Sequence, residues 1–323
     1  MKKNNTFFNL TIKRLIRHFL TINSFLDVWF ITIHIITIVF GKILKIKHLI
    51  IYDILLSGKY AIAKLKEFDE GDKYNFNGIL LPKIELKEPN DFKKLYELYM
   101  YAIETLYIYL YNNDDYSSKI VDLYDKYVPD GSYFYKNNNG IDVTIKNGDI
   151  VLDLGACLGE FSVYAAKRGA TVYAFEPSKT NRELLIETIK LNGLEKNINI
   201  IPFGVGEKNE TLYFNNKTGN IGASTFINEA DPSTEAVEVV CLDDWAKNMK
   251  LSISFIKADI EGFERYMLLG AKYLLQTQHP KLSLCTYHLV DDPLVIKNTI
   301  INANPQYEII QRHFKLFACI PGF

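Results

Sequence analysis

The chain has 323 residues, of which 48% are apolar and 23% are charged. This composition supports a packed globular core and excludes wholesale disorder. The net charge of −1 gives no global sign of nucleic-acid binding, so we expect no nucleic-acid partner.

The four cysteines lie far apart, and three of them fall in strand-like runs: Cys157, Cys241, Cys285 and Cys319. They form no C-x-x-C pair and no metal-ligand spacing. We therefore expect reduced, buried thiols in a cytoplasmic protein, and we assign no metal ligand.

Positive charge is concentrated in residues 1–60, where nine lysines and arginines face two aspartates, a net charge of +7. Such an excess is typical of a segment that contacts an anionic membrane face. Residues 28–41 lack charged side chains, but the run is shorter than the roughly 20 apolar residues of a spanning helix. We favour a buried helix here over a helix on the membrane surface, and a spanning helix ranks last. The inner face of the membrane is thus the alternative to a purely cytoplasmic location.

The rest of the N-terminal third also indicates helices. Residues 67–90 are polar and read as a connector, and residues 91–111 carry tyrosines and leucines at helical spacing. We interpret that stripe as a packing surface rather than a sugar-stacking platform. A further helix is expected over residues 118–127, and short strands over Tyr133–Tyr135 and Val143–Ile145. We therefore predict a mainly helical region at 1–115, with membrane association as an alternative to a soluble region, and a second domain at 116–323.

An alternation of strands and helices begins at Val151. The apolar run Val151–Leu154 ends in a Gly155-to-Gly159 turn, and a helix is predicted from Phe161 to Arg168. A strand over 170–175 and a helix opened by a capping box at Thr180 follow. The next strand, 198–203, ends in a turn at 204–206. The later predictions are an antiparallel pair over 211–214 and 237–242, strands over 254–258 and 282–286, helices over 263–269 and 294–302, and a closing strand pair over 307–311 and 316–320. This order predicts a mostly parallel α/β sheet that binds ligands at the carboxyl ends of its strands.

The loop after the first strand indicates a nucleoside cofactor. Glu176 follows the second strand, where an acid accepts hydrogen bonds from ribose hydroxyls. A dinucleotide loop needs G-x-G-x-x-G, but Cys157 and Glu160 stand at the second and third glycine positions. The acids Asp153 and Glu160 suit a cationic, phosphate-free cofactor, so we favour S-adenosylmethionine over NAD.

Residues 150–288 resemble the FkbM family of S-adenosylmethionine-dependent methyltransferases. The resemblance rests on VLDLGACLGEFS at 151–162, VYAFEPS at 172–178, GVG at 204–206, GAST at 222–225, VVCLDDW at 239–245 and FIKADIEGFE at 255–264. It implies a Rossmann-like class I methyltransferase fold, with a mostly parallel seven-stranded sheet and helices on both faces. It also implies a cofactor pocket at Asp153, Gly155, Ala156, Cys157, Gly159, Glu176, Pro177, Ser178, Gly204 and Val205.

Candidate catalytic residues follow the fourth and fifth main strands: Lys257, Asp259, Glu261 and His288. His288 has the most suitable ordinary pKa for a base, and Asp259 the best position. A structural histidine and a Lys257 paired with Glu261 or Glu264 are the alternatives, and a cation site at Asp259, Glu261 and His288 is disfavoured because no fixed ligand spacing supports it. Asp243-Asp244-Trp245 is expected to cap a helix.

We therefore predict O-methylation of a sugar hydroxyl in a glycan, glycolipid or natural product, a function that the family resemblance implies. The alternatives are N-methylation of a small amine, an NAD-dependent reaction, and a non-catalytic nucleoside-binding or membrane-tethering protein. The expected partner is a small-molecule or glycan acceptor, with peripheral membrane contact through residues 1–60.

Overall fold

The computed structural model describes residues 66–76, 78–83, 133–215, 225–227, 234–312 and 314–322. The predictions for residues 1–65, for the helices over 91–111 and 118–127, and for a domain boundary near residue 116 lie outside these residues. So does most of the GAST block. Within the described ranges, no helix has the length and apolar character needed to cross a membrane.

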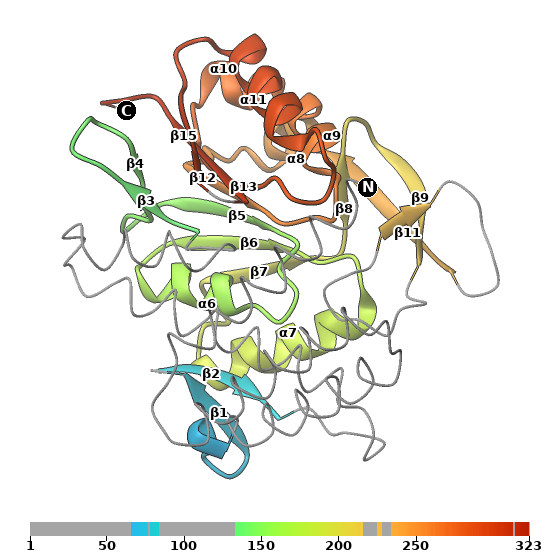
Figure 1. The fold of residues 1–323 in the computed structure, drawn as a ribbon. Coiled ribbons are helices and arrows are strands. Elements are labelled where there is room, and N and C mark those ends of the chain that lie inside the picture. The colour runs from blue at the N-terminus through green and yellow to red at the C-terminus, as the bar shows by residue number, and fades with distance from the viewer. Residues whose placement is uncertain are drawn as a thin grey trace, which may run out of the picture.

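A seven-stranded sheet forms the centre of the fold (Figure 1). Its strands are β5 (Ile150–Leu154), β6 (Thr171–Phe175), β7 (Ile198–Ile201), β12 (Phe255–Ala258), β13 (Lys281–Cys285), β14 (Glu308–Arg312) and β15 (Lys315–Cys319). Their spatial order is β14-β15-β13-β12-β5-β6-β7. The five strands from β13 to β7 are parallel, whereas β15 runs antiparallel to both neighbours. The prediction of a mostly parallel, Rossmann-like sheet is confirmed.

Helices cover both faces of this sheet, because each inner strand alternates its buried side chains between two hydrophobic cores. One core joins the sheet to α6 (Glu160–Lys167) and α7 (Lys179–Asn192). The other joins it to α8 (Leu242–Met249), α9 (Glu264–Leu269), α10 (Lys272–Thr277) and α11 (Asp292–Ala303). In β5, Val151 belongs to the first core and Leu152 to the second.

A second, four-stranded sheet lies beside the main one, in the order β10-β9-β11-β8. The predicted antiparallel pair is confirmed as β9 (Glu210–Asn215) and β11 (Thr234–Cys241), joined by β10 (Thr225–Ile227). The turn predicted at 204–206 is wrong. These residues form β8 (Gly204–Gly206), which pairs in parallel with the end of β11. The two glycines resemble a turn in sequence, but pairing with a neighbouring strand decides their conformation.

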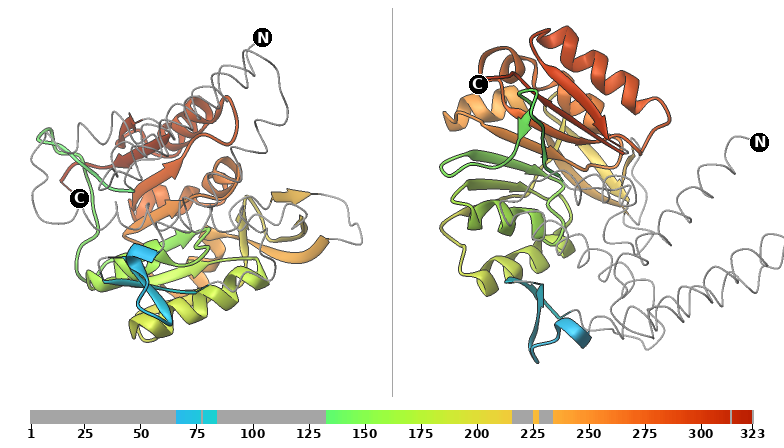
Figure 2. Two further views of the ribbon diagram at one scale, coloured as in Figure 1. Left: turned by 60° about the horizontal axis from the view of Figure 1, so that its bottom comes forward. Right: turned by 60° about the vertical axis from the view of Figure 1, so that its left-hand side comes forward.

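Two short hairpins complete the described part of the chain. The first, β1 (Lys73–Phe76) and β2 (Ile79–Pro82), occupies residues that we predicted to be a connector. It lies beside α7 (Figure 2), where the Asn192 side chain donates to the Leu80 carbonyl at 2.7 Å and accepts from its N–H at 3.1 Å. The second consists of β3 (Tyr135–Lys136) and β4 (Asp142–Val143), shifted slightly from the predicted strands.

The start of α7 differs from the predicted capping box. Ser178, not Thr180, is the N-cap, and its hydroxyl accepts from the Asn181 N–H at 3.4 Å. The helix begins at Lys179, so the motif at Thr180 lies inside its first turn. Asp243 caps a helix as predicted, but the helix is α10: its carboxylate accepts from the N–H groups of Tyr273 and Leu274 at 2.8 and 2.9 Å.

The cysteines are all free thiols. Cys241, Cys285 and Cys319 end strands β11, β13 and β15, as their strand-like surroundings predict. Cys285 and Cys319 are buried, but Cys157 and Cys241 are half-buried, so the expectation of four buried thiols is half correct.

Candidate functional site

The sequence-predicted site residues gather at the carboxyl ends of β5, β6, β12 and β13. The chain leaves β5 toward β6 on one side and reaches β12 on the other, so the strand order reverses between β5 and β12. A crevice for ligands forms at such a reversal, because the loops from the two central strands turn in opposite directions.

The loop from Gly155 to Gly159 bends tightly around the end of β5. Gly155 and Gly159 have φ of 76° and 89°, and Cys157 adopts the left-handed region with φ of 50°. The N–H groups of Gly155 and Ala156 both donate to the Phe175 carbonyl at 3.0 Å, which fixes the loop on β6. A Cβ at Gly155 would lie 2.1 Å from the Asp259 carbonyl oxygen, so this position requires glycine. The loop therefore lies directly against the strand end that carries Asp259.

Asp153 and Lys257 form a buried ion pair beneath this loop. They are directly opposite each other in the register of β5 and β12, and Lys257 Nζ lies 2.9 Å from Asp153 Oδ1. Ser162 donates to the other carboxylate oxygen at 2.6 Å, and Lys257 donates to the Gly155 carbonyl at 2.8 Å. The predicted pairing of Lys257 with Glu261 or Glu264 is wrong, because a residue in a strand meets its cross-strand neighbour rather than a residue four positions later. The Asp153 charge is thus already neutralised by an ammonium group.

Glu176 ties the end of β6 to the same loop. Its carboxylate accepts from the N–H groups of Cys157 and Ser178 at 2.8 and 2.9 Å, and the side chain is buried. Burial raises the pKa of Glu176, although these hydrogen bonds oppose the shift. Pro177, also a predicted pocket residue, accepts from Arg182 through its carbonyl at 2.6 Å.

Gly204 and Val205 lie farther along the same edge, in β8 rather than in a turn. The Val205 side chain is buried in the core beside Phe175 and Trp245. A contact between these two residues and a cofactor remains a prediction. Because the Val205 side chain is buried, backbone atoms of β8 would make such a contact.

Asp259 follows β12 directly and is held by two tyrosines. Tyr133 donates to Oδ2 at 2.8 Å, and Tyr287, which follows β13, donates to Oδ1 at 3.0 Å. Burial alone would raise the pKa of Asp259, but the positive charges of His288, Lys257 and Lys315 outweigh it and lower the pKa. Asp259 is therefore a carboxylate at neutral pH.

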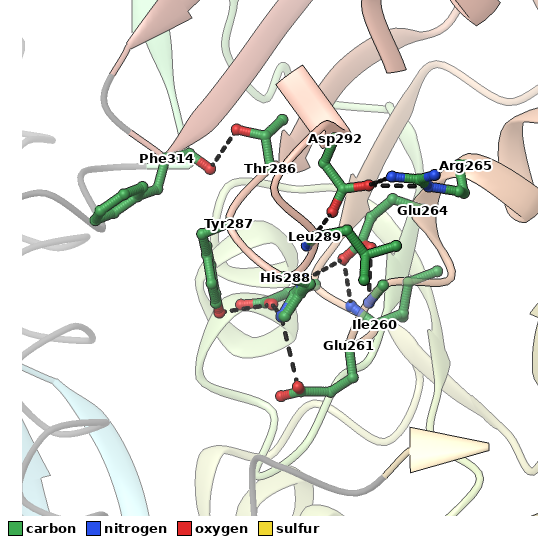
Figure 3. Close-up of polar contacts among 12 residues, drawn as sticks. Ile260, Glu261, Glu264, Arg265, Thr286, Tyr287, His288, Leu289, Asp292 and Phe314 are labelled. Carbon is green, nitrogen blue, oxygen red and sulfur yellow. Dashed lines mark hydrogen bonds and ion pairs between the residues drawn. The ribbon is translucent and has the colours of Figure 1, made fainter. Parts of the chain in front are cut away.

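His288 lies among three carboxylates (Figure 3). Its Nε2 is 3.4 Å from Asp259 Oδ1 and 3.6 Å from Glu261 Oε2, and its Nδ1 is 3.0 Å from Glu264 Oε1. Burial lowers the pKa of His288, but these carboxylates outweigh burial and raise the pKa to about 9. His288 is the chemically favoured base only at its ordinary imidazole pKa. With its pKa raised in this way, His288 is protonated at neutral pH and does not accept a proton.

Glu264 organises the turn between β12 and α9. Its carboxylate is fully buried and accepts from the N–H groups of Ile260 and Gly262 at 2.9 and 3.0 Å. Between them, Glu261 has a positive φ of 55°. Burial raises the pKa of Glu261 to about 7, with the negative charges of Asp259 and Glu264 adding to the shift and His288 opposing it.

The β12–α9 and β13–α11 loops are joined by a second set of ion pairs (Figure 3). The Arg265 guanidinium donates to Asp292 at 2.6 Å and to Asp291 at 2.7 Å, and Asp292 also accepts from the Leu289 N–H at 2.7 Å. This contact fixes the loop that carries His288 relative to the one that carries Asp259.

Sequence reasoning missed three residues of this site. The sequence places Tyr133 only in a short strand, and it offers Glu264 only as an alternative partner of Lys257. Lys315, whose Nζ lies 4.0 Å from the Tyr133 ring centroid, gave no signal because it opens an ordinary strand. Nothing in a single sequence brings residues 133 and 315 next to residue 259.

Three donors of different residues approach closely enough to share a metal ion. One ligand atom each from Asp259, Glu264 and His288 lie within 4.8 Å of one another. Among the residues that the structure describes, these three form the one group of His, Cys, Asp and Glu side chains with such spacing.

Comparisons with known proteins agree with the geometry. Residues 153–313 match the family model of the methyltransferase FkbM domain. The methyltransferase FkbM from Methylobacillus flagellatus KT is similar in structure, with a TM-score of 0.46 and 19% identity over 82% of this chain, which spans 59% of that protein's length. An rRNA methylase from Streptococcus thermophilus gives a TM-score of 0.35 and 13% identity, over 54% of this chain and 86% of its own.

Fibrillarin from Aeropyrum pernix, solved with bound S-adenosyl-L-methionine, gives a TM-score of 0.34 and 12% identity over 54% of this chain and 67% of its own. No curated protein sequence matches the chain. The family match covers the loop after β5, the strand ends and the Asp259–His288 cluster. The predicted class I methyltransferase fold is thereby confirmed, and the domain at residues 153–313 belongs to the FkbM methyltransferase family.

Proposed function

We propose that this chain transfers a methyl group from S-adenosylmethionine to a hydroxyl group of a sugar. The observation that carries the proposal is the direct contact between two parts of the site. The Gly155–Gly159 loop, the proposed cofactor site, packs against the Asp259 carbonyl, and the Asp259 side chain opens the polar cluster on the other side. Methyl transfer requires this juxtaposition, since donor and acceptor must be aligned in one water-poor space.

The residues around the loop fit a cationic nucleoside. Three left-handed residues turn the loop backbone, and two of the five positions from 155 to 159 have no side chain beyond hydrogen. The buried carboxylates of Glu160 and Glu176 flank it. When bound, S-adenosylmethionine supplies a methyl group on a positively charged sulfur. Glu176 would accept from the ribose hydroxyls, while Asp153 and Lys257 hold the loop in shape.

The polar cluster fits a hydroxyl acceptor. Carboxylates accept hydrogen bonds from hydroxyl groups, and aromatic rings pack against the apolar faces of a sugar. Both kinds of group are present: Asp259 accepts from Tyr287, and Glu261 lies beside His288. The Tyr287 side chain is half-exposed and packs edge-on to Phe314. We assign the role of proton acceptor to Glu261, whose carboxylate lies 3.6 Å from His288 Nε2. Asp259, held between two tyrosines, would orient the acceptor.

Transfer of a radioactive methyl group tests the proposal. The full chain is incubated with methyl-labelled S-adenosylmethionine and with glycan, glycolipid, nucleic-acid and protein fractions. We expect label in the glycan or glycolipid fraction, recovered after acid hydrolysis as a methyl ether of a monosaccharide. An Asp259→Asn variant should lose the transfer, whereas Lys247→Met, an exposed change on α8, should keep it.

Other outcomes would redirect or end the proposal. Label on an amine would favour N-methylation, and label in the RNA fraction would identify a nucleic-acid acceptor. Absence of S-adenosylmethionine binding in isothermal titration calorimetry, or undiminished binding in Glu176→Ala, would refute the proposed cofactor site.

A further inference from the structure

The Asp259–Glu264–His288 cluster brings like charges together inside the protein. Asp259 follows β12, Glu264 begins α9 and His288 follows β13, so three separate elements contribute to it. The side chains are 23%, 0% and 7% exposed. Two carboxylates at this depth repel each other strongly unless positive charge lies between them, and either a protonated His288 or a bound cation can supply that charge.

On its Nε2 side, His288 is spaced more widely from its neighbours than a hydrogen bond, whereas its Nδ1 lies 3.0 Å from Glu264 Oε1. Nε2 lies 3.4 Å from Asp259 and 3.6 Å from Glu261, whereas N–H···O bonds span about 2.7–3.2 Å. Neither ring nitrogen makes a hydrogen bond of normal geometry within the described residues, although the side chain is more than nine-tenths buried. Donors that share one cation at about 2.1 Å lie roughly 3–3.5 Å apart. One donor atom each from Asp259, Glu264 and His288 lie within 4.8 Å of one another, so a small inward movement of these side chains brings them to that spacing.

The surrounding contacts hold the carboxylates in place. Glu264 is fixed by two backbone N–H groups, and Asp259 by two tyrosine hydroxyls. Hydrogen bonds of this kind orient the ligands of metal sites and leave lone pairs of each carboxylate for the ion. The strained turn at Glu261, with φ of 55°, keeps a further carboxylate at the rim of the cluster.

We propose that a divalent cation binds between Asp259, Glu264 and His288 and holds hydroxyl oxygens of the acceptor beside the methyl donor. One imidazole and two carboxylates suit Mn²⁺ or Zn²⁺. Mg²⁺ binds an imidazole nitrogen more weakly than these ions do. Three protein donors leave coordination positions for two neighbouring sugar hydroxyls. A cation there makes a hydroxyl group more acidic and fixes its position, and Glu261 at the rim is placed to take the proton. The inference rests on the proposed function, because the acceptor is taken to be a hydroxyl compound.

Binding of Mn²⁺ to the full chain tests the site directly. Protein stripped with a chelator is titrated with MnCl₂, and binding is followed by calorimetry and by the loss of the free-ion paramagnetic resonance signal. We expect one ion per chain. Glu264→Gln and His288→Asn should each weaken binding about tenfold or more. Glu187→Gln, which removes an exposed carboxylate on α7, should bind like the unaltered chain.

The controls separate this inference from the proposed function. Circular dichroism shows whether each variant folds. If Glu264→Gln does not fold, His288→Asn alone tests the site. S-adenosylmethionine binding, measured without metal, should persist in the stripped chain, while methyl transfer should be lost and return with Mn²⁺.

Two results would overturn the metal site: no bound ion, or equal affinity in Glu187→Gln and both cluster variants. The cluster would then be a closed ion-pair network around a protonated imidazole. Methyl transfer that persists in stripped protein would also overturn it while leaving the proposed function intact. Loss of S-adenosylmethionine binding in the unaltered, metal-loaded chain would instead refute the proposed function.

Discussion

At the scale of single residues, the Asp153–Lys257 ion pair carries the clearest energetic consequence. The two side chains are 0% and 3% exposed, so each charge depends on the other for stabilisation. Lys257→Met leaves a buried carboxylate without its partner and should lower the free energy of unfolding by about 3–5 kcal/mol. Urea denaturation measures this loss.

The matched control is Lys247→Met, which removes an exposed lysine and should leave stability nearly unchanged. The double variant Asp153→Asn, Lys257→Met removes both charges and should recover most of the loss. If Lys257→Met unfolds at the same urea concentration as Lys247→Met, the ion pair does not contribute as described.

Gly155 gives a second prediction at this scale. Its φ of 76° and the nearby Asp259 carbonyl, 2.1 Å from an added Cβ, act together against any side chain. Gly155→Ala should therefore abolish S-adenosylmethionine binding and lower stability by more than the ~1–2 kcal/mol of left-handed strain alone. Gly193→Ala isolates the strain, because Gly193 has φ of 64° and nothing within 4 Å of an added Cβ. Equal stability losses in the two variants would contradict the close packing of the loop on Asp259.

The sequence predicted these residues unequally well. Gly155 and Glu176 were identified because a strand, a tight turn and an acid at the next strand end form a local pattern. The partner of Lys257 was wrong, since cross-strand pairing depends on strand order and register, which are properties of the whole sheet. Tyr133 donates to Asp259 from 126 positions before it, and Lys315 of β15 packs over the Tyr133 ring. No local pattern encodes such contacts.

At the scale of elements, α10 depends on a side chain from another helix. Asp243 belongs to the first turn of α8, yet its carboxylate caps two N–H groups of α10. Asp243→Ala should lower the free energy of unfolding by about 0.5–2 kcal/mol, the usual contribution of a cap. Asp244→Ala, which removes a surface contact with Asn209 at 2.9 Å, should have a smaller effect. Equal effects in urea denaturation would show that the cap is not the cause.

The elements themselves were predicted where the pattern is strong. All seven strands of the main sheet and helices α6, α7, α9 and α11 lie near their predicted positions. The failures share a cause: α10, β8 and the β1–β2 hairpin are short, and each is stabilised by a partner distant in sequence. Asp243 secures α10, the end of β11 pairs with β8, and Asn192 of α7 holds β2. Local propensity cannot outweigh such tertiary contacts in elements of three to six residues.

At the scale of the whole molecule, charge is divided unevenly along the chain. Residues 1–60 carry +7 in a chain whose total is −1, so the remainder carries −8. An anionic membrane attracts basic side chains with about 1 kcal/mol each near its surface. We predict that the full chain binds vesicles containing phosphatidylglycerol and is released by high salt, because salt shortens the reach of these attractions to about 3 Å at 1 M. Co-sedimentation measures the bound fraction.

Matched charge removal distinguishes the N-terminal segment from the rest of the surface. A variant with glutamine at Lys2, Lys3, Lys13, Arg14 and Arg17 should lose most of the vesicle binding. A control with glutamine at five exposed lysines of the methyltransferase domain should retain it: Lys190, Lys196, Lys208, Lys247 and Lys250. Binding that survives in the first variant, or that is equally strong on neutral vesicles, would exclude electrostatic attraction through residues 1–60. A membrane-associated acceptor would then lose its main support from the sequence, whereas the site at the strand ends would keep the same chemistry.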